Sequence, residues 1–330
     1  MNPPLSLFYE EPDPDRWLPG DRHPRRWLRR IIRGPRRPGG QERVFLNLCA
    51  GLDRLGVTYT VNRYRAARRN PGMPVGIIGK AHVLELQPWR NPILFGASVM
   101  SHPLADPGLL ARHPNLRRIL VPGEWMRRMC VPHWGDRVHV WPVGIDTAAW
   151  SPAPGQRDID VLLYDKVRWE HDRYTQELID PIRTHLTLRG LRVAVIRYGY
   201  YREEDFAALL QRSRSMVFLC EHETQGIAYQ QTLACGVPIL AWDRGGCWQD
   251  PEFYPARVQF SPVSSVPYWD ERCGATFATG AEFPVAFDTF WAQLQAGHYQ
   301  PRDYILANLT LERCARLYLD QWSATFGPIA

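Results

Sequence analysis

Short apolar runs alternate with longer polar or amphipathic stretches along most of the chain. In the amphipathic stretches, apolar residues recur every three or four positions, as on one face of a helix, and glycine or proline often marks the ends. This alternation is typical of a doubly wound, mostly parallel α/β sheet. In the first half, the runs that predict strands are 5–9, 59–61, 75–78, 83–86, 93–99, 119–121 and 138–141.

The second half repeats the pattern after a segment rich in proline and glycine, 141–152, which we interpret as an interdomain linker. The predicted strands there are 159–164, 193–196, 216–220 and 237–242, and the predicted helices are about 171–189, 203–213 and one or two between 302 and 326. We therefore expect an N-terminal domain (1–146), a C-terminal domain (147–305) and a C-terminal helix (306–330) that packs back on the N-terminal domain.

One unit of this pattern is more polar than the rest, the stretch from Cys220 to Gly246. The strand 216–220 meets a polar loop, Glu221-His-Glu-Thr-Gln-Gly226, which a helix ending near Gly236 and a further strand follow. In a parallel sheet such a loop lies at the carboxyl edge, where ligands bind, and the first N–H groups of the helix attract an anion. We expect the chemistry of the protein at this loop.

Other predicted strand ends also carry polar or glycine residues. Lys166 and Arg168 follow the strand 159–164, and Gly199 follows the strand 193–196. His102 follows the strand 93–99; its imidazole either faces the cleft or is packed as an ordinary structural residue. Gly39 and Gly40 precede a helix that begins near 41. Either these two glycines let the backbone come close to a phosphate, or they form an ordinary turn before the helix.

Composition agrees with a globular, enzyme-sized protein of 330 residues rather than a disordered one, since 45% of the residues are hydrophobic and 12% are aromatic. No apolar run approaches the ~20 residues that cross a bilayer, and the N-terminus lacks the apolar region of a signal peptide, so we expect a cytoplasmic protein. The seven cysteines are scattered without a C-x-x-C pair, which favours reduced thiols over disulfides or zinc.

The positive charge is concentrated in one segment. Residues 16–37 contain nine Arg and one Asp, although the whole chain carries only +6, so we expect no nucleic-acid partner. This segment belongs to an insertion at about 10–38, in which the pattern PRRWLRRIIRGPRR predicts a short basic amphipathic helix. Such a helix suits an anionic membrane surface or a lipid-phosphate acceptor; the alternative is a solvated loop whose apolar residues dock on the domain.

Three segments resemble the retaining, nucleotide-sugar-dependent GT-B glycosyltransferases of family 4. Gly39-Gly-Gln-Glu-Arg43 resembles the family's GGAERV loop, and Val143-Gly-Ile-Asp146 with Trp150-Ser-Pro152 resembles its NGVD…F.P linker. The stretch 223–238, ETQGIAYQQTLACGVP, is similar to EGFGLVLLEAMACGLPV. The resemblance implies an α/β GT-B fold, with two Rossmann-like domains facing across a cleft.

The resemblance also implies roles for particular residues. Glu223 matches the first glutamate of the family's E-x7-E motif, which contacts hydroxyls of the donor sugar, whereas Gln231 replaces the second, whose carboxylate holds the ribose. An amide still hydrogen-bonds a ribose, more weakly than a carboxylate. The implied catalytic residues are His102, Glu223 and Lys166, and the implied donor-binding residues are Gly39, Gly40, Lys166, Arg168, Arg197, Gly199, Glu223, Thr224, Gln225, Gly226, Ile227 and Gln231.

We therefore expect a glycosyltransferase (EC 2.4) that moves a sugar from a nucleotide-diphosphate sugar to a hydroxyl of a glycan, lipid-linked or other acceptor. We expect retention, no cofactor, and no metal, because Asp13-Pro-Asp15 and Asp158-Ile-Asp160 are poorly placed as the metal-binding D-x-D of the GT-A class. The setting would be cell-surface glycan or glycolipid synthesis at the inner face of a membrane.

Two alternatives remain open. A hydrolase or epimerase can use the same fold. Gln231 also leaves room for a catalytically degenerate subunit that binds a nucleotide sugar or a membrane surface as a partner.

Overall fold

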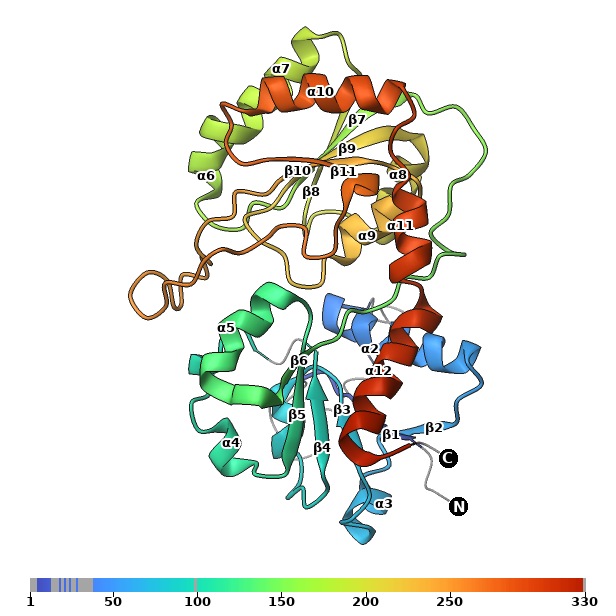
Figure 1. Cartoon of the computed structure of the whole chain (residues 1–330), viewed down its shortest axis with the longest axis vertical. Helices are drawn as coiled ribbons and strands as arrows, with labels where there is room; N and C mark the ends of the chain where they lie inside the picture. The colour runs from blue at the N-terminus through green and yellow to red at the C-terminus, as the bar shows by residue number, and fades with distance from the viewer. Residues whose placement is uncertain are drawn as a thin grey trace.

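The computed structural model describes residues 5–12, 18, 21, 24, 28, 38–97 and 100–328. Two parallel sheets with flanking helices lie one above the other along the long axis of the molecule (Figure 1). Most of the predicted insertion at 10–38, including all nine arginines of 16–37, lies outside the described residues.

The first domain contains a six-stranded parallel sheet with the order β2-β1-β3-β4-β5-β6. Its strands are β1 (Leu5–Phe8), β2 (Tyr59–Val61), β3 (Val75–Ile77), β4 (Ile93–Gly96), β5 (Leu116–Val121) and β6 (Val138–Val140). Its helices are α2 (Gly40–Arg54), α3 (Tyr64–Arg69), α4 (Leu109–Arg112) and α5 (Glu124–Trp134), with 3-10 turns η1 (Ala81–Glu85), η2 (Pro103–Ala105) and η3 (Gly135–Arg137). Six predicted strands are confirmed.

The predicted strand at 83–86 is wrong, because this segment forms the 3-10 turn η1. Val83 and Leu84 are buried, which explains the apolar run, but β3 pairs directly with β4 and leaves no place for a strand between them. The Trp89 indole donates a hydrogen bond to the Val83 carbonyl at 3.0 Å and holds the turn against the core.

The second domain contains a five-stranded parallel sheet with the order β11-β10-β9-β7-β8. Its strands are β7 (Ile159–Asp165), β8 (Val193–Arg197), β9 (Ser213–Leu219), β10 (Ile239–Trp242) and β11 (Gly274–Phe277). Its helical elements are α6 (His171–Tyr174), the π-helical turn η4 (Thr175–Ile179), α7 (Asp180–Leu188), α8 (Glu203–Arg212), α9 (Ile227–Ala234), η5 (Glu271–Cys273), α10 (Phe283–Gln295) and α11 (Pro301–Asn308). The four predicted strands are confirmed, whereas β11 and α10 were not predicted.

The last helix, α12 (Leu311–Phe326), returns to the first domain and packs against α2 (Figure 1). The approach is close, since a side chain at Gly51 of α2 would overlap the Leu311 carbonyl. Tyr318 and Trp322 of α12 lie in one core cluster with Leu5 and Leu7 of β1. The end of the chain is thus a structural part of the first domain.

A second connection comes from the long segment between β10 and β11. We call residues 244–268 the crossing segment, because it leaves the second sheet and lies beside α5 of the first domain (Figure 1). Its residues Trp248, Phe253, Val258 and Val263 belong to the core cluster formed by β3, β4 and β5. Arg257 of this segment also donates to the Leu104 carbonyl at 3.2 Å. The second domain therefore completes the core of the first.

Candidate active site

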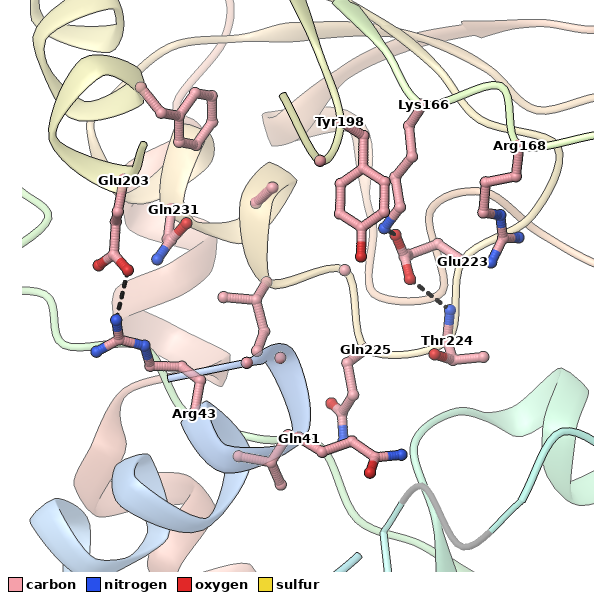
Figure 2. A pocket seen from close by; sticks show the side chains of 18 of the residues that line it. Gln41, Arg43, Lys166, Arg168, Tyr198, Glu203, Glu223, Thr224, Gln225 and Gln231 are labelled. Atoms are coloured by element: carbon pink, nitrogen blue, oxygen red, sulfur yellow. Dashed lines mark hydrogen bonds and ion pairs between the residues drawn. The ribbon is translucent and has the colours of Figure 1, made fainter. Parts of the chain in front are cut away.

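A cleft of about 1010 Å³ lies between the two domains. The first domain lines it with the start of α2 and with the segment after β4, and the second domain with the loops that follow β7, β8 and β9 (Figure 2). Because carboxyl ends of parallel strands share one sheet edge, the polar loops predicted from the sequence converge there.

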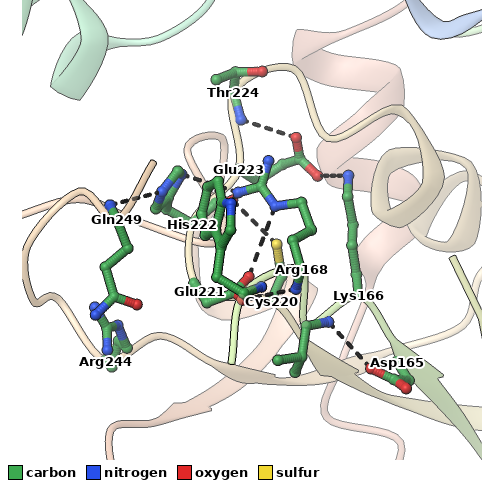
Figure 3. A network of polar contacts seen from close by, with 12 residues as sticks. Asp165, Lys166, Arg168, Cys220, Glu221, His222, Glu223, Thr224, Arg244 and Gln249 are labelled. Carbon is green, nitrogen blue, oxygen red and sulfur yellow. Dashed lines mark hydrogen bonds and ion pairs between the residues drawn. The ribbon is translucent and has the colours of Figure 1, made fainter. Parts of the chain in front are cut away.

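Two of the predicted residues, Lys166 after β7 and Glu223 after β9, form a buried ion pair in the wall of this cleft (Figures 2 and 3). The other carboxylate oxygen of Glu223, Oε1, accepts a hydrogen bond from the Thr224 N–H at 2.9 Å. Burial alone would raise the pKa of Glu223, but Lys166 and Arg168 outweigh it and hold that pKa below its usual range. Both members of the pair are therefore charged at neutral pH.

A second carboxylate, Glu221, joins the loops after β7 and β9. Its Oε1 accepts hydrogen bonds from the N–H groups of Arg168 at 2.7 Å and Trp169 at 2.9 Å. The Arg168 guanidinium in turn donates to the His222 carbonyl at 2.7 Å (Figure 3). These contacts fix the backbone that presents Lys166 and Arg168 to the cleft.

His222 lies beside these groups as a neutral imidazole. Burial, and then the nearby Arg168 charge, lower its pKa to about 2. The ring accepts from the Gln249 N–H at 3.3 Å and packs near the indoles of Trp125 and Trp169. It completes an aromatic wall on this side of the cleft.

The first domain holds the loop 221–226 in place through direct contacts. The Trp125 indole of α5 donates to the Glu223 carbonyl at 2.9 Å, and both residues are buried. The Val143 N–H donates to the Gln225 side-chain oxygen at 3.3 Å. The position of Glu223 therefore depends on both domains.

The start of α9 faces the cleft, and its geometry suits an anion. Gly226 has a left-handed φ of 65°, and a side chain there would overlap the Tyr229 ring, so only glycine fits. No side chain caps this helix, which leaves its first N–H groups open to a ligand. The buried Gln225 amide nitrogen, Nε2, has no hydrogen-bond partner in the part of the chain that the structure describes, and Gln225 lines the same cleft.

The start of α2 faces the cleft from the opposite side. Gly39 is the N-cap; among the described residues no side chain caps the helix, and no atom of theirs lies within 4 Å of where a side chain would begin at Gly39 or Gly40. Both glycines line the cleft. Two uncapped helix starts thus border one space.

The structure brings together most of the residues singled out from the sequence. Gly39, Gly40, Lys166, Arg168, Gly199, Glu223, Thr224, Gln225, Gly226, Ile227 and Gln231 all line the cleft.

His102 and Arg197 lie away from the lining. His102 is 2% exposed, its Nδ1 accepts from the Leu104 N–H at 3.1 Å, and burial followed by His133 and Arg257 lowers its pKa to about 4. Arg197 lies on the exposed side of β8, 4.0 Å from Asp165, and its neighbours Tyr198 and Gly199 line the cleft instead. The predicted roles of His102 and Arg197 stay predictions.

Sequence reasoning missed three contributors to the site. Arg43 of α2 and Glu203 of α8 form an ion pair that joins the two domains (Figure 2). The third is Trp125. The sequence could have indicated Glu203, since this residue begins the helix after a strand that ends at the cleft edge. It could not have indicated Trp125, because the role of Trp125 depends on how the two domains dock.

Within residues 5–12, 38–97 and 100–328, His, Cys, Asp and Glu side chains nowhere gather in a group of three or more that suits a metal ion. Among the helices of the same ranges, none combines the length and apolar character that crossing a bilayer requires.

Comparisons with known proteins identify the fold. No family model matches the chain, and no curated protein matches its sequence. Among solved structures, WaaG, a glycosyltransferase involved in lipopolysaccharide biosynthesis, is similar with a TM-score of 0.54 at 11% identity over 98% of this chain and 100% of WaaG. The lipopolysaccharide outer core galactosyltransferase WaaB is similar with a TM-score of 0.50 at 10% identity over 87% of this chain and 96% of WaaB.

TarM is also similar, with a TM-score of 0.50 at 8% identity over 77% of this chain, but the chain spans only 54% of TarM. At such identities the likeness concerns the fold alone. The chain has the α/β GT-B fold of glycosyltransferases, with two Rossmann-like domains facing across a cleft, as the sequence predicted.

Proposed function

We propose that the protein is a retaining glycosyltransferase that uses a nucleotide-diphosphate sugar. One observation carries this proposal: cationic side chains and an uncapped helix start lie around one interdomain cleft, beside a buried carboxylate. Lys166, Arg168 and the N–H groups at Gly226 and Ile227 match a diphosphate, and Glu223 matches sugar hydroxyls. The GT-B fold supports this assignment by analogy.

In the proposed reaction, the bond between the sugar C1 and the diphosphate oxygen breaks while a bond from C1 to the acceptor oxygen forms on the same face. The acceptor proton passes to the departing diphosphate, which gains negative charge. Lys166 and Arg168 stabilise that charge, which is the task that a metal ion performs in other transferases. A chelator should therefore leave the activity unchanged, and a product with inverted stereochemistry would contradict the proposal.

The proposed acceptor is a hydroxyl of a glycan or a lipid-linked sugar, in cell-surface glycan or glycolipid synthesis. WaaG and WaaB, which match almost along their whole lengths, are described as lipopolysaccharide enzymes, and this supports the assignment. The basic segment 16–37 would bind an anionic inner membrane surface. Flotation with vesicles of anionic lipid tests this membrane binding, with a variant in which the arginines of 16–37 are replaced by glutamine as the comparison. Equal binding of the wild-type protein and the variant would contradict it.

The decisive experiment is incubation with a panel of nucleotide-diphosphate sugars, followed by measurement of released nucleoside diphosphate. The wild-type protein should release nucleotide from one donor, and Glu223→Gln should not. Arg168→Gln gives a second test of nucleotide release. The Arg168 side chain is a partly exposed cation and does not belong to the buried pair of Lys166 and Glu223. Near-UV circular dichroism would confirm that each variant is folded.

A second candidate function is a non-catalytic partner subunit that binds a nucleotide sugar. Gln231 favours it, because an amide lies in the cleft where the resembled family has a carboxylate. Calorimetry distinguishes the two functions: tight binding of a nucleotide sugar without release of nucleotide, with or without acceptor extracts, would favour the partner subunit.

A further inference from the structure

The first domain has a second, smaller pocket outside the cleft. Its volume is about 250 Å³, and the described residues that line it are Glu10, Tyr64, Arg68, Leu86 and Gln87, which do not line the cleft. Ligand pockets usually measure about 300 Å³ or more. This pocket therefore suits one small molecule and is too small for a nucleotide.

The pocket is separate from the cleft but close to it. Glu10 follows β1 and Tyr64 begins α3 after β2, so both lie beyond the carboxyl ends of two adjacent parallel strands. Tyr9, which precedes Glu10, stacks on Phe45 of α2 with the ring centroids 5.0 Å apart, and the neighbouring Val44 lines the cleft. One stacked pair of rings thus connects the wall of the pocket to the wall of the cleft.

The wall of the pocket contains polar groups without partners. Both polar atoms of the Gln87 amide, Nε2 and Oε1, are buried and have no hydrogen-bond partner in the part of the chain that the structure describes, and the same holds for the Tyr64 hydroxyl. Burial, and then nearby Glu10, raise the pKa of Tyr64, so its hydroxyl keeps its proton and can donate. Buried polar groups in native proteins nearly always have a partner, which indicates that a polar molecule fills this pocket.

The combination of groups suits a neutral sugar. A sugar hydroxyl donates one hydrogen bond and accepts two; the Glu10 carboxylate accepts, the Arg68 guanidinium donates, and the Gln87 amide does both. Leu86, which is 41% exposed, offers an apolar surface to the C–H face of a sugar ring. A carboxylate and a guanidinium in one wall disfavour a ligand with a single strong charge, such as phosphate, because one of the two groups always repels it.

We propose that this pocket binds one neutral sugar residue of the acceptor glycan, away from the hydroxyl that reacts in the cleft. Glu10, Arg68 and Gln87 hydrogen-bond the hydroxyls of this sugar, and Leu86 packs against its ring. The first domain thus recognises a unit of the acceptor that takes no part in the reaction, so an oligosaccharide should be a better acceptor than a monosaccharide. This inference rests on the proposed function, because it assumes a glycan acceptor.

Saturation-transfer-difference NMR tests the pocket with the methyl glycosides of glucose, galactose, mannose and N-acetylglucosamine, in the absence of nucleotide. The wild-type protein should bind at least one of them. Gln87→Leu should weaken this binding about tenfold or more, because it removes two hydrogen bonds. The same variant should keep or raise the urea midpoint of unfolding, because the replaced amide has no partner among the described residues.

Arg68→Gln and Arg69→Gln form a matched pair, since both arginines are exposed on α3 but Arg68 alone of the two lines the pocket. Arg68→Gln should weaken sugar binding, whereas Arg69→Gln should keep it. Arg168→Gln, in the cleft, should also keep sugar binding, because the two sites are separate.

The inference is overturned if no glycoside binds the wild-type protein, if Gln87→Leu binds as the wild-type protein does, or if Arg68→Gln and Arg69→Gln lose binding equally. Competition by inorganic phosphate would assign the pocket to an anion, and a lower urea midpoint in Gln87→Leu would mean that the chain itself holds the amide; either result overturns it as well. These measurements need no nucleotide sugar. Failure of every donor to release nucleotide would therefore contradict the proposed function alone, and sugar binding that persists would still support the pocket.

Discussion

The two domains bring different chemistry to the same cleft. The second domain supplies most of the charged groups, since Lys166, Arg168 and Glu223 all follow its strands, and the first domain adds Arg43. The first supplies a glycine turn at α2 and the Trp125 indole that holds the Glu223 loop. Under the proposed function, the second domain would bind most of the ligand charge, while the first domain fixes the position of the loop that carries Glu223.

A contrast also appears between individual arginines away from the cleft. In the second domain, Arg192 and Arg214 both pair with Asp160, at 3.0 and 3.2 Å. In the first domain, Arg65 and Arg68 of the exposed helix α3 form no ion pair within the described ranges 38–97 and 100–328. Arg192 and Arg214 thus support local structure, whereas Arg65 and Arg68 remain on the surface.

Glu223→Gln should have the largest effect, because it removes the negative partner of a buried lysine. The free energy of unfolding should fall by about 3 to 5 kcal/mol, and nucleotide-sugar binding should be lost. Urea denaturation and calorimetry measure the two effects. The double variant Lys166→Met with Glu223→Leu should recover most of the stability but no binding; a single variant as stable as the wild-type protein would show that the pair is not effectively buried.

Trp248→Ala tests the contribution of the second domain to the core of the first. Removal of this buried side chain should lower the free energy of unfolding by about 3 kcal/mol, since the indole packs among side chains of the first domain. Tyr200→Ala, at a position that is 78% exposed, is the control and should change it by less than about 0.5 kcal/mol. Similar losses in both variants would mean that the crossing segment does not pack tightly in solution.

Acid should weaken the fold through two neutral histidines, His102 in the first domain and His222 in the second. As the pH falls below about 6.5, the unfolded chain takes up protons at these residues. The folded chain does not do so until about pH 4 at His102 and about pH 2 at His222, so stability present above pH 6.5 is progressively lost below it.

His102→Asn separates the contribution of the first domain, since asparagine can still cap η2 but does not titrate. The stability lost between pH 7.5 and pH 5 should be smaller by about 2 kcal/mol in this variant than in the wild-type protein. Denaturation curves at the two pH values measure the difference. An identical pH dependence would show that His102 is protonated in the folded state.

The smallest effect should come from the surface arginines. Arg192→Gln should lower the free energy of unfolding slightly, because it removes a partner of the nearly buried Asp160, and Arg65→Gln should lower it less. Urea denaturation of both variants in the same buffer provides the comparison. Equal costs would show that the ion pair with Asp160 adds nothing to stability.

The sequence predicted the strands well because each central strand is buried on both faces and appears as an apolar run; all seven residues of β7 are buried. The same signal failed at η1, because an apolar run reports burial and not pairing. The loops at the sheet edge could also be predicted, because each of them begins where an apolar run ends. The pairing of Arg43 with Glu203 could not, since it depends on how two separately encoded domains dock.

The crossing segment bears on how such a chain can be recombined. The linker at 141–152 looks like the natural point at which to exchange halves between related chains, and the sequence alone marks it as the boundary. Yet Trp248 and Phe253, about a hundred residues later, belong to the core of the first half, and α12 returns to it as well. In a chimera joined only at the linker, the core of the first domain would combine residues from two different chains. A working exchange must therefore transfer the first half, the crossing segment and α12 together.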